Sequence, residues 1–174
     1  PNTYQIRDST QKISNKIFTK DELNLPKNSF VFCCFNQNYK ITPNVFDIWM
    51  RLLKKVEKSV LWLIKDNDVA AYNLKKEAEK RGVASDRIIF AKHMPISEHL
   101  ARHKVADLFV DTFPYTAHTT CSDALWSGLP VITRMGQSFT SRVAGSLLNA
   151  VNLKELITKT EKEYENLILK LSKN

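Results

Sequence analysis

The densest group of hydrogen-bonding side chains in the sequence lies between residues 118 and 123. His118, Thr119 and Thr120 are consecutive, and Asp123 follows three residues later. The pattern predicts that a helix begins at Thr119 and Thr120, directly after a loop. The start of a helix offers unpaired backbone N–H groups and a partial positive charge, which suit a phosphate group. Taken alone, these residues also fit a threonine that caps a helix behind an ordinary polar loop.

Other polar residues complete a set that suits a nucleoside diphosphate. Lys40 supplies a mobile positive charge, and Gln37 supplies an amide donor. Asp123 only accepts hydrogen bonds when ionised, which suits ribose hydroxyls, whereas His118 and His99 can donate to a phosphate or pack against a base. Four or five charge-assisted hydrogen bonds of this kind are enough for binding at roughly micromolar strength.

Several other chemistries lack their sequence signatures. The four glycines form neither G-x-G-x-x-G nor G-x-x-x-x-G-K-[ST], so a dinucleotide dehydrogenase or a P-loop NTPase is not expected. No G-x-S-x-G elbow occurs, so a hydrolase of this fold would lack its nucleophile. No Cys-x-x-Cys pair occurs either. His99 and His103 are four residues apart on a predicted helix and could hold two corners of a zinc site. Because neither an H-E-x-x-H pattern nor a third ligand accompanies them, we predict no metal.

Apolar runs of strand length position these groups. Buried strands are predicted at 29–35, 59–65, 87–92, 108–111 and 130–133. Helices are predicted from Pro43 to Val56, from Val69 to a cap at Gly82, from an N-cap at Ser97 to Lys104, from Thr119, from Ser138 to Asn149, and from Leu153 to Leu171. This alternation predicts an α/β fold with a doubly wound, mostly parallel, Rossmann-like sheet and helices on both faces. Ligands of such sheets bind outside the carboxyl ends of the strands, where the polar groups at 36–40, 93–99 and 112–123 all fall.

The chain has the length of one domain, with 174 residues. Residues 1–28 are polar and without periodicity, so we expect a lead-in or linker from a preceding lobe, followed by a Rossmann-like lobe over 29–174. Because the first residue is Pro rather than Met, we also expect the sequence to be a piece of a longer chain.

Composition narrows the partners and the compartment. The net charge of +8 fits nucleic acid, a nucleotide or an acidic protein face, but the cations are dispersed and equally fit solvated helix faces. The cysteines, Cys33, Cys34 and Cys121, are odd in number and two are adjacent, which favours a reducing compartment and the cytoplasm. No apolar run approaches the ~20 residues of a membrane span, and we find no signal peptide, so no membrane association is expected.

A nucleic-acid partner is not expected either. Trp49, Trp62 and Phe90 fall on positions that face the predicted core rather than an exposed stacking platform. Steep salt dependence of RNA binding would revive that hypothesis.

Five motifs in the sequence resemble those of a known family. The motifs that carry the resemblance are FNQNYKI at 35–41, SVLWLIK at 59–65, RIIFAKHMPISEH at 87–99, LFVDTFPYTAHTTCSDALWSGLPVIT at 108–133 and SRVAGSLL at 141–148. They are similar to the C-terminal catalytic lobe of the O-linked N-acetylglucosamine transferases and their SPINDLY-type relatives. The resemblance covers roughly residues 29–171, and the D-T-x-x-x-x-x-H-T-T-x-x-D run followed by L-W-x-G-x-P-V is specific to that family.

The resemblance implies one lobe of a GT-B glycosyltransferase, an inverting enzyme that needs no metal. Its two Rossmann-like lobes enclose a sugar nucleotide, and it transfers a sugar, here N-acetylglucosamine from its UDP-sugar, to Ser or Thr hydroxyls of proteins. The positions that match the family's donor-binding residues are Gln37 and Lys40 on the diphosphate, His118, Thr119 and Thr120 on a phosphate, Asp123 on the ribose, His99 on the nucleotide, and the backbone near Met94 facing the base. Lys40 would be the catalytic residue, because it stabilises the departing diphosphate.

Two departures from the family's pattern leave the donor open. Ile96 stands where a lysine often covers the nucleoside, and Tyr115 stands where a smaller residue is common near the sugar. UDP-N-acetylglucosamine, UDP-glucose and GDP-fucose all stay open. Protein acceptors would bind through a missing lobe or upstream repeats, so this piece alone is expected to be inactive. The alternative function is a non-catalytic nucleotide-sugar-binding or interaction module of the same fold.

Overall fold

The computed structural model describes residues 3–173 and contains a sheet of six strands in the order β3-β2-β1-β4-β5-β6. The strands are β1 Phe30–Cys34, β2 Ser59–Ile64, β3 Ile88–Ala91, β4 Leu108–Val110, β5 Val131–Arg134 and β6 Ile157–Thr158. All neighbouring pairs are parallel. The predicted doubly wound, Rossmann-like α/β fold is therefore confirmed. The chain adds β2 and β3 on one side of β1 and then β4, β5 and β6 on the other side, so the strand order reverses between β1 and β4.

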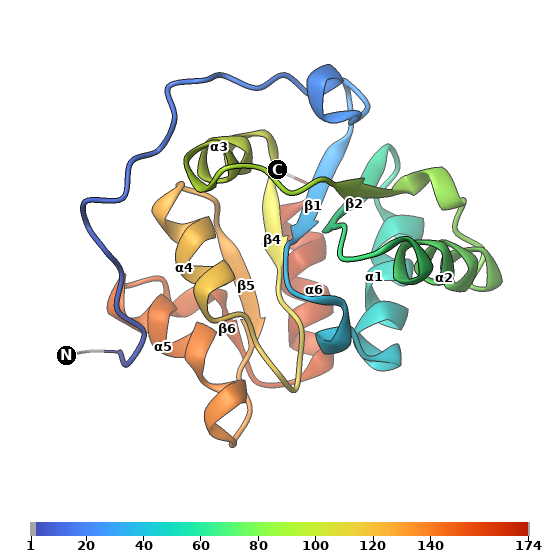
Figure 1. The fold of residues 1–174 in the computed structure, drawn as a ribbon. Coiled ribbons are helices and arrows are strands. Elements are labelled where there is room, and N and C mark those ends of the chain that lie inside the picture. The colour runs from blue at the N-terminus through green and yellow to red at the C-terminus, as the bar shows by residue number, and fades with distance from the viewer. Residues whose placement is uncertain (1–2, 174) are drawn as a thin grey trace.

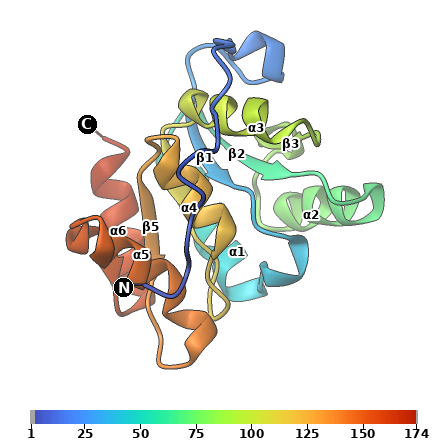
Figure 2. The ribbon, with the colours of Figure 1, turned by 60° about the vertical axis from the view of Figure 1, so that its left-hand side comes forward.

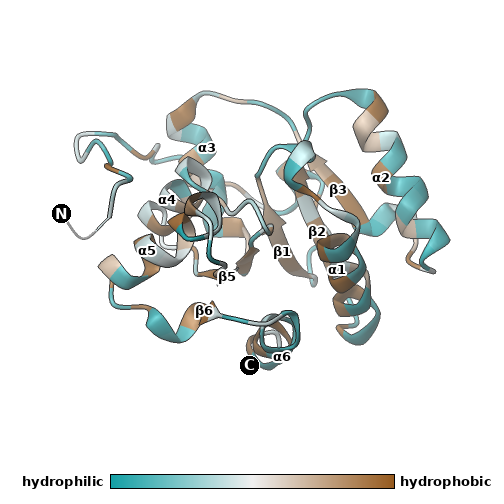
Figure 3. Ribbon diagram, turned by 90° about the horizontal axis from the view of Figure 1, so that it is seen from below, coloured by the Kyte–Doolittle hydropathy of each residue, from teal (hydrophilic) through white to brown (hydrophobic). Residues whose placement is uncertain are grey.

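Helices cover both faces of this sheet (Figures 1 and 3). The α-helices are α1 Pro43–Lys55, α2 Asp68–Lys80, α3 Ile96–Arg102, α4 Thr119–Trp126, α5 Val143–Ala150 and α6 Glu161–Leu171. Short 3₁₀ turns are η1 Asp21–Leu23, η2 Asn38–Lys40, η3 Ser85–Arg87, η4 His103–Val105, η5 Phe139–Ser141 and η6 Lys154–Leu156. Figure 3 shows α3, α4 and α5 together on one face and α1 and α6 on the other, in agreement with the contacts between these helices.

The central strands are buried on both faces because helices cover them. Every residue of β2 is buried, as the unbroken apolar run predicts. Trp49 on α1 and Trp62 on β2 are buried, and Phe90 is half-buried against the same core. These three aromatic residues therefore pack against the core, as predicted from their positions.

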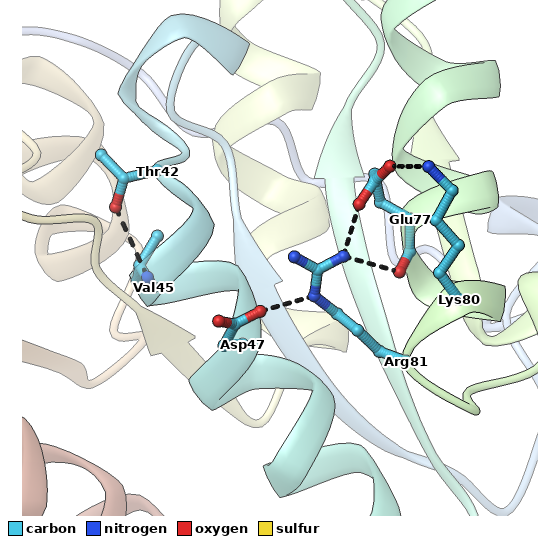
Figure 4. Close-up of polar contacts among 6 residues, drawn as sticks. All are labelled: Thr42, Val45, Asp47, Glu77, Lys80 and Arg81. Carbon is cyan, nitrogen blue, oxygen red and sulfur yellow. Dashed lines mark hydrogen bonds and ion pairs between the residues drawn. The ribbon is translucent and has the colours of Figure 1, made fainter.

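Local sequence signals set the first two helices (Figure 4). The Thr42 hydroxyl accepts a hydrogen bond from the backbone N–H of Val45 and caps α1, and Pro43 follows at the first helical position. Arg81, just after α2, bonds Asp47 of α1 and Glu77 of α2, so it ties the two helices together.

Three predicted helix boundaries are wrong. Ser97 does not cap α3, which begins at Ile96 behind Pro95 without a side-chain cap. The predicted helix over 138–149 begins only at Val143, since 139–141 form the turn η5. The predicted helix over 153–171 divides into η6, the short strand β6 and α6, because Ile157 pairs with Thr133 of β5.

The predicted lead-in is extended apart from η1 and runs across α4, from beside α5 to α3 (Figure 2). Residues 1 and 2 of the predicted lead-in lie outside the described residues. Within residues 3–173, no helix combines the length and the apolar character that crossing a membrane requires.

Candidate functional site

The predicted site residues gather where the strand order of the sheet reverses, between β1 and β4. β1 and β4 are neighbours, with Phe32 opposite Leu108 and Cys33 opposite Phe109. The chain leaves β1 toward α1 and β2 on one side, and it leaves β4 toward α4 and β5 on the other. A crevice forms outside the carboxyl ends of two such strands, and it is the usual ligand site of an open α/β sheet.

A buried carboxylate organises the loop after β4. Asp111 accepts hydrogen bonds from the backbone N–H of Ala117 at 2.7 Å, the Thr133 hydroxyl at 2.7 Å and the Asn36 amide at 3.1 Å. Burial raises the pKa of Asp111 to about 6, although these donors act to lower it. Because Ala117 immediately precedes His118, the carboxylate fixes the entry of the chain into α4.

Asn36 joins the loop after β1 to the start of α4. Its amide nitrogen donates to the Thr112 hydroxyl at 2.7 Å, and its amide oxygen accepts from the Thr120 hydroxyl. Asn36 is buried, so these bonds are shielded from water. Asn36 follows the end of β1 and belongs to the polar group predicted at 36–40, but the sequence alone did not predict a role for it.

Lys40 and His118 lie on one aromatic side chain. The Lys40 ammonium is 3.8 Å from the centre of the Tyr115 ring and donates to the Thr116 carbonyl at 3.2 Å. The rings of Tyr115 and His118 are 5.2 Å apart. Burial lowers the pKa of Lys40 from its ordinary value, while the nearby Asp111 opposes that change. Residues 78 positions apart in the sequence thus meet, as a shared phosphate site requires.

The start of α4 is not capped by a side chain. His118 occupies the N-cap position but makes no side-chain capping bond, which contradicts the alternative of a threonine cap. Its ring instead contacts the Tyr4 hydroxyl at 3.3 Å and the Thr140 carbonyl at 3.4 Å. Burial lowers the pKa of His118. Thr119, in the first turn, is exposed, so the helix start is open to a ligand.

A cavity of about 310 Å³ adjoins this helix start. Its lining is Phe35, Gln37, Ile64, Asp66, His93, Met94, Ile96, His99, Thr120 and Asp123. The structure therefore brings five of the predicted residues into one cavity, namely Gln37, Met94, His99, Thr120 and Asp123. Lys40, His118 and Thr119 are not part of this lining. They gather beside Tyr115 and at the open helix start, so the predicted residues form two adjoining groups.

His99 is held neutral at one end of the cavity. Burial, followed by the nearby Arg102 charge, lowers the pKa of His99 to about 3. The Arg102 guanidinium contacts Nδ1 of His99, and since arginine only donates, Nδ1 accepts and Nε2 carries the proton. Arg102 is itself buried and donates to the Lys92 carbonyl at 2.6 Å. Sequence reasoning missed Arg102, for which the only signal was its place one turn after His99.

The two histidines considered for zinc have other partners. His103 contacts the His99 carbonyl through Nδ1 at 2.7 Å, and the two rings meet edge to face with centres 4.8 Å apart. Across residues 3–173, no group of three His, Cys, Asp or Glu side chains is placed to hold a metal ion.

The segment before β1 also contacts the site, which sequence reasoning did not anticipate. We call residues 4–14 the strap. The Gln11 carbonyl accepts from the Trp126 indole at 3.3 Å, and the backbone N–H of Ser14 donates to the Ser97 carbonyl at 3.0 Å. The strap therefore crosses α4 and reaches α3 beside the cavity (Figure 2).

Comparison with known proteins adds the evolutionary context. Residues 5–174 match the sequence model described as Glycosyl transferase family 41. The chain is 37% identical over 163 residues to a UDP-N-acetylglucosamine–peptide N-acetylglucosaminyltransferase of Caenorhabditis elegans, covering 92% of this chain and 14% of that protein. It is 36% identical over 180 residues to the probable transferase SEC of Arabidopsis thaliana, covering 100% of this chain and 18% of the relative.

A solved structure has the same fold. A mutant O-GlcNAc transferase of Thermobaculum terrenum superposes with a TM-score of 0.80 at 36% identity, covering 84% of this chain and 29% of that chain. The chain thus spans less than a fifth of the length of these two curated relatives and less than a third of that structure. The predicted family resemblance is confirmed.

Proposed function

The chain belongs to glycosyl transferase family 41, and from that premise we propose that it is the donor-binding lobe of an inverting O-glycosyltransferase. The protein that contains it would transfer N-acetylglucosamine from a UDP-sugar to Ser or Thr hydroxyls of proteins. The single observation that carries this proposal is the uncapped start of α4 beside the half-buried Lys40.

This arrangement suits a departing diphosphate. When an acceptor hydroxyl displaces the nucleotide from the anomeric carbon, negative charge grows on the phosphate oxygens. Unpaired N–H groups at Thr119 and Thr120 and the Lys40 ammonium would stabilise that charge without a metal. Because Lys40 is held over Tyr115, it is oriented before the donor arrives.

The other predicted residues take roles that follow from their positions. Gln37 and Lys40 would contact the diphosphate, His118 a phosphate, and Asp123 the ribose hydroxyls. His99, a neutral Nε2–H donor in the cavity, and the backbone near Met94 would contact the nucleotide base.

The donor and the acceptor are inferred from the relatives. Their names specify UDP-N-acetylglucosamine as donor and a peptide as acceptor, which supports the same pair here. The apolar Ile96 lines the cavity and adds no charge to the nucleoside. The acceptor would bind to parts of the protein other than this chain.

We also propose a lead-in over 1–28 followed by a donor lobe over 29–174. We propose the cytoplasm as the compartment, and the three buried free cysteines support that compartment.

Replacing Lys40 tests this proposal. In the full-length protein that contains this chain, we expect Lys40→Ala to lower kcat by roughly two to three powers of ten, because its contact with the leaving group tightens in the transition state. The measurement is sugar transfer to a protein acceptor, together with thermal unfolding to verify that the variant is folded.

The matched control is Lys75→Ala, which removes the same charge from an exposed position on α2. It should leave transfer unchanged. Near-normal turnover of the Lys40→Ala protein would contradict the catalytic role, and UDP binding without any transfer by the unmodified protein would favour a non-catalytic binding module.

A further inference from the structure

Arg7 of the strap contacts the predicted ribose-binding acid. Its guanidinium nitrogen Nη1 forms an ion pair with Oδ1 of Asp123 and lies 3.5 Å from the Ser122 hydroxyl. The guanidinium carbon is 5.2 Å from the centre of the Trp126 ring. The Arg7 side chain is 15% exposed, so this pair lies mostly out of water, where it is screened little by salt.

Arg7 lies behind the carboxylate rather than in the cavity. Asp123 is part of the cavity lining and Arg7 is not. The ion pair uses only Oδ1 of Asp123, and within residues 3–173 no hydrogen bond joins Oδ2 to another protein group. One carboxylate oxygen is therefore fixed from the strap side, while the other stays available to a ligand's hydroxyl groups.

The charge of Arg7 determines the direction in which the Asp123 carboxylate points. Asp123 is only 6% exposed, and a carboxylate that is taken out of water without a partner is unfavourable. Arg7 supplies the compensating charge, and its stacking on Trp126 fixes the angle from which that charge acts. Nε and Nη2 of Arg7 are buried without a partner, so the hydrogen bonds of the guanidinium are those that Nη1 donates to Asp123 and, at 3.5 Å, to the Ser122 hydroxyl.

We infer that Arg7 is a positioning residue of the nucleotide site: through its ion pair with Asp123, it sets the carboxylate to receive the ribose hydroxyls of the donor. This inference rests on the proposed function, since it assumes that a nucleoside diphosphate occupies the cavity. The segment before β1 is then part of the nucleotide site.

The test measures recognition of the ribose separately from overall affinity. Calorimetry on the full-length protein compares UDP with 2′,3′-dideoxy-UDP, which lacks both ribose hydroxyls. We expect the unmodified protein to prefer UDP by about tenfold or more, as one or two hydrogen bonds to a charged group provide. Asp123→Ala should bring the ratio close to one. Arg7→Ala should reduce it to within about threefold, and Arg7→Lys, which keeps the charge but loses the planar stacking, should fall between.

Lys12→Ala is the matched control, because it removes a positive charge from an exposed position on the same strap. Its ratio should equal that of the unmodified protein. In the Asp123→Ala background, adding Arg7→Ala should change the ratio no further.

The outcomes separate the two proposals. If Arg7→Ala weakens both nucleotides equally and keeps the ratio, Arg7 is only structural and the inference is overturned. A further loss of ribose preference in the Asp123→Ala background would equally overturn it, because Arg7 would then act elsewhere. Should the unmodified protein bind neither nucleotide, the proposed function itself fails.

Discussion

Two neighbouring histidines of the site are neutral because the fold buries them. Burial lowers the pKa of His99 to about 3 and that of His103 to about 4. Between pH 4 and pH 6.5 the unfolded chain therefore binds more protons at these residues than the folded chain does. The free energy of unfolding must fall as pH falls through that window, and this stabilisation is complete only above pH 6.5.

His103→Asn tests this pH dependence. The Asn amide can still donate to the His99 carbonyl that His103 contacts, but it does not titrate. The variant should lose less stability between pH 7 and pH 5, by on the order of 2 kcal/mol, when urea unfolding is measured at both values.

Asp111 titrates with the opposite sign. Burial raises its pKa to about 6, so the folded chain retains that proton in a range where the unfolded chain has lost it. Because Asp111 is present in both proteins, its effect cancels in the comparison. Equal losses of stability in the variant and the unmodified protein would contradict the assignment to His103.

At the scale of residues, the sequence predicted that the polar group at 118–123 stands at a helix start and that Lys40 belongs to the same site. The predicted group at 118–123 lies at the start of α4, and Lys40 lies beside it. Sequence reasoning missed Arg7, because its partner depends on how distant segments pack, and it also missed Arg102, although His99 lies only three residues before it. Arg7 meets Asp123 across 116 positions, and no local periodicity records such a pair.

At the scale of elements, the bounds of a helix were predictable where the apolar pattern and the capping residues indicate the same start or end. The Pro43 and Gly82 signals were correct: α1 begins at Pro43, and Gly82, with φ +72°, follows the end of α2. The predicted helix over 153–171 was wrong because its apolar stripe has helical spacing throughout, although Ile157 and Thr158 pair with β5 and form the edge strand β6. Edge pairing depends on the sheet, so helical spacing alone did not reveal it.

Thr160 marks the true start of α6. Its hydroxyl accepts from the backbone N–H of Glu163 at 3.1 Å, and the Glu163 carboxylate accepts from the backbone N–H of Thr160 at 3.2 Å. This capping box directs Tyr164 into the core, where its hydroxyl donates to the Asp111 carbonyl at 2.7 Å.

Removing this cap should destabilise the chain. Thr160→Ala is expected to lower the free energy of unfolding by about 1 kcal/mol, as measured by urea denaturation at pH 7. Lys162→Ala, at an exposed position in the first turn of α6, is the control and should change stability by less than about 0.5 kcal/mol. If both variants were equally stable, the capping box would contribute nothing to the folded state.

At the scale of the whole molecule, the strand order explains why the site lies where it does. Alternating strands and helices predicted an open parallel sheet, and the carboxyl ends of β1 and β4 then supply the loops that carry Lys40 and His118. The sequence pattern did not reveal the path of the strap, because extended polar segments leave no periodic signal. Its contacts depend on the finished surface of α4.

The same architecture predicts how the isolated chain should behave. The cavity and the open helix start provide one wall for a nucleotide, and a GT-B enzyme encloses its donor between two lobes. A nucleotide on this chain alone would therefore be only partly desolvated, and its charge-assisted bonds would be weakened by water.

We expect calorimetry to give UDP affinity at least about tenfold weaker for the isolated chain than for the full-length protein, with no sugar transfer. The unfolding temperature of the isolated chain should then rise only at UDP concentrations well above those that saturate the full-length protein. Submicromolar binding by the isolated chain would mean that one lobe suffices to enclose the nucleotide, and the division of the donor site between two lobes would be wrong.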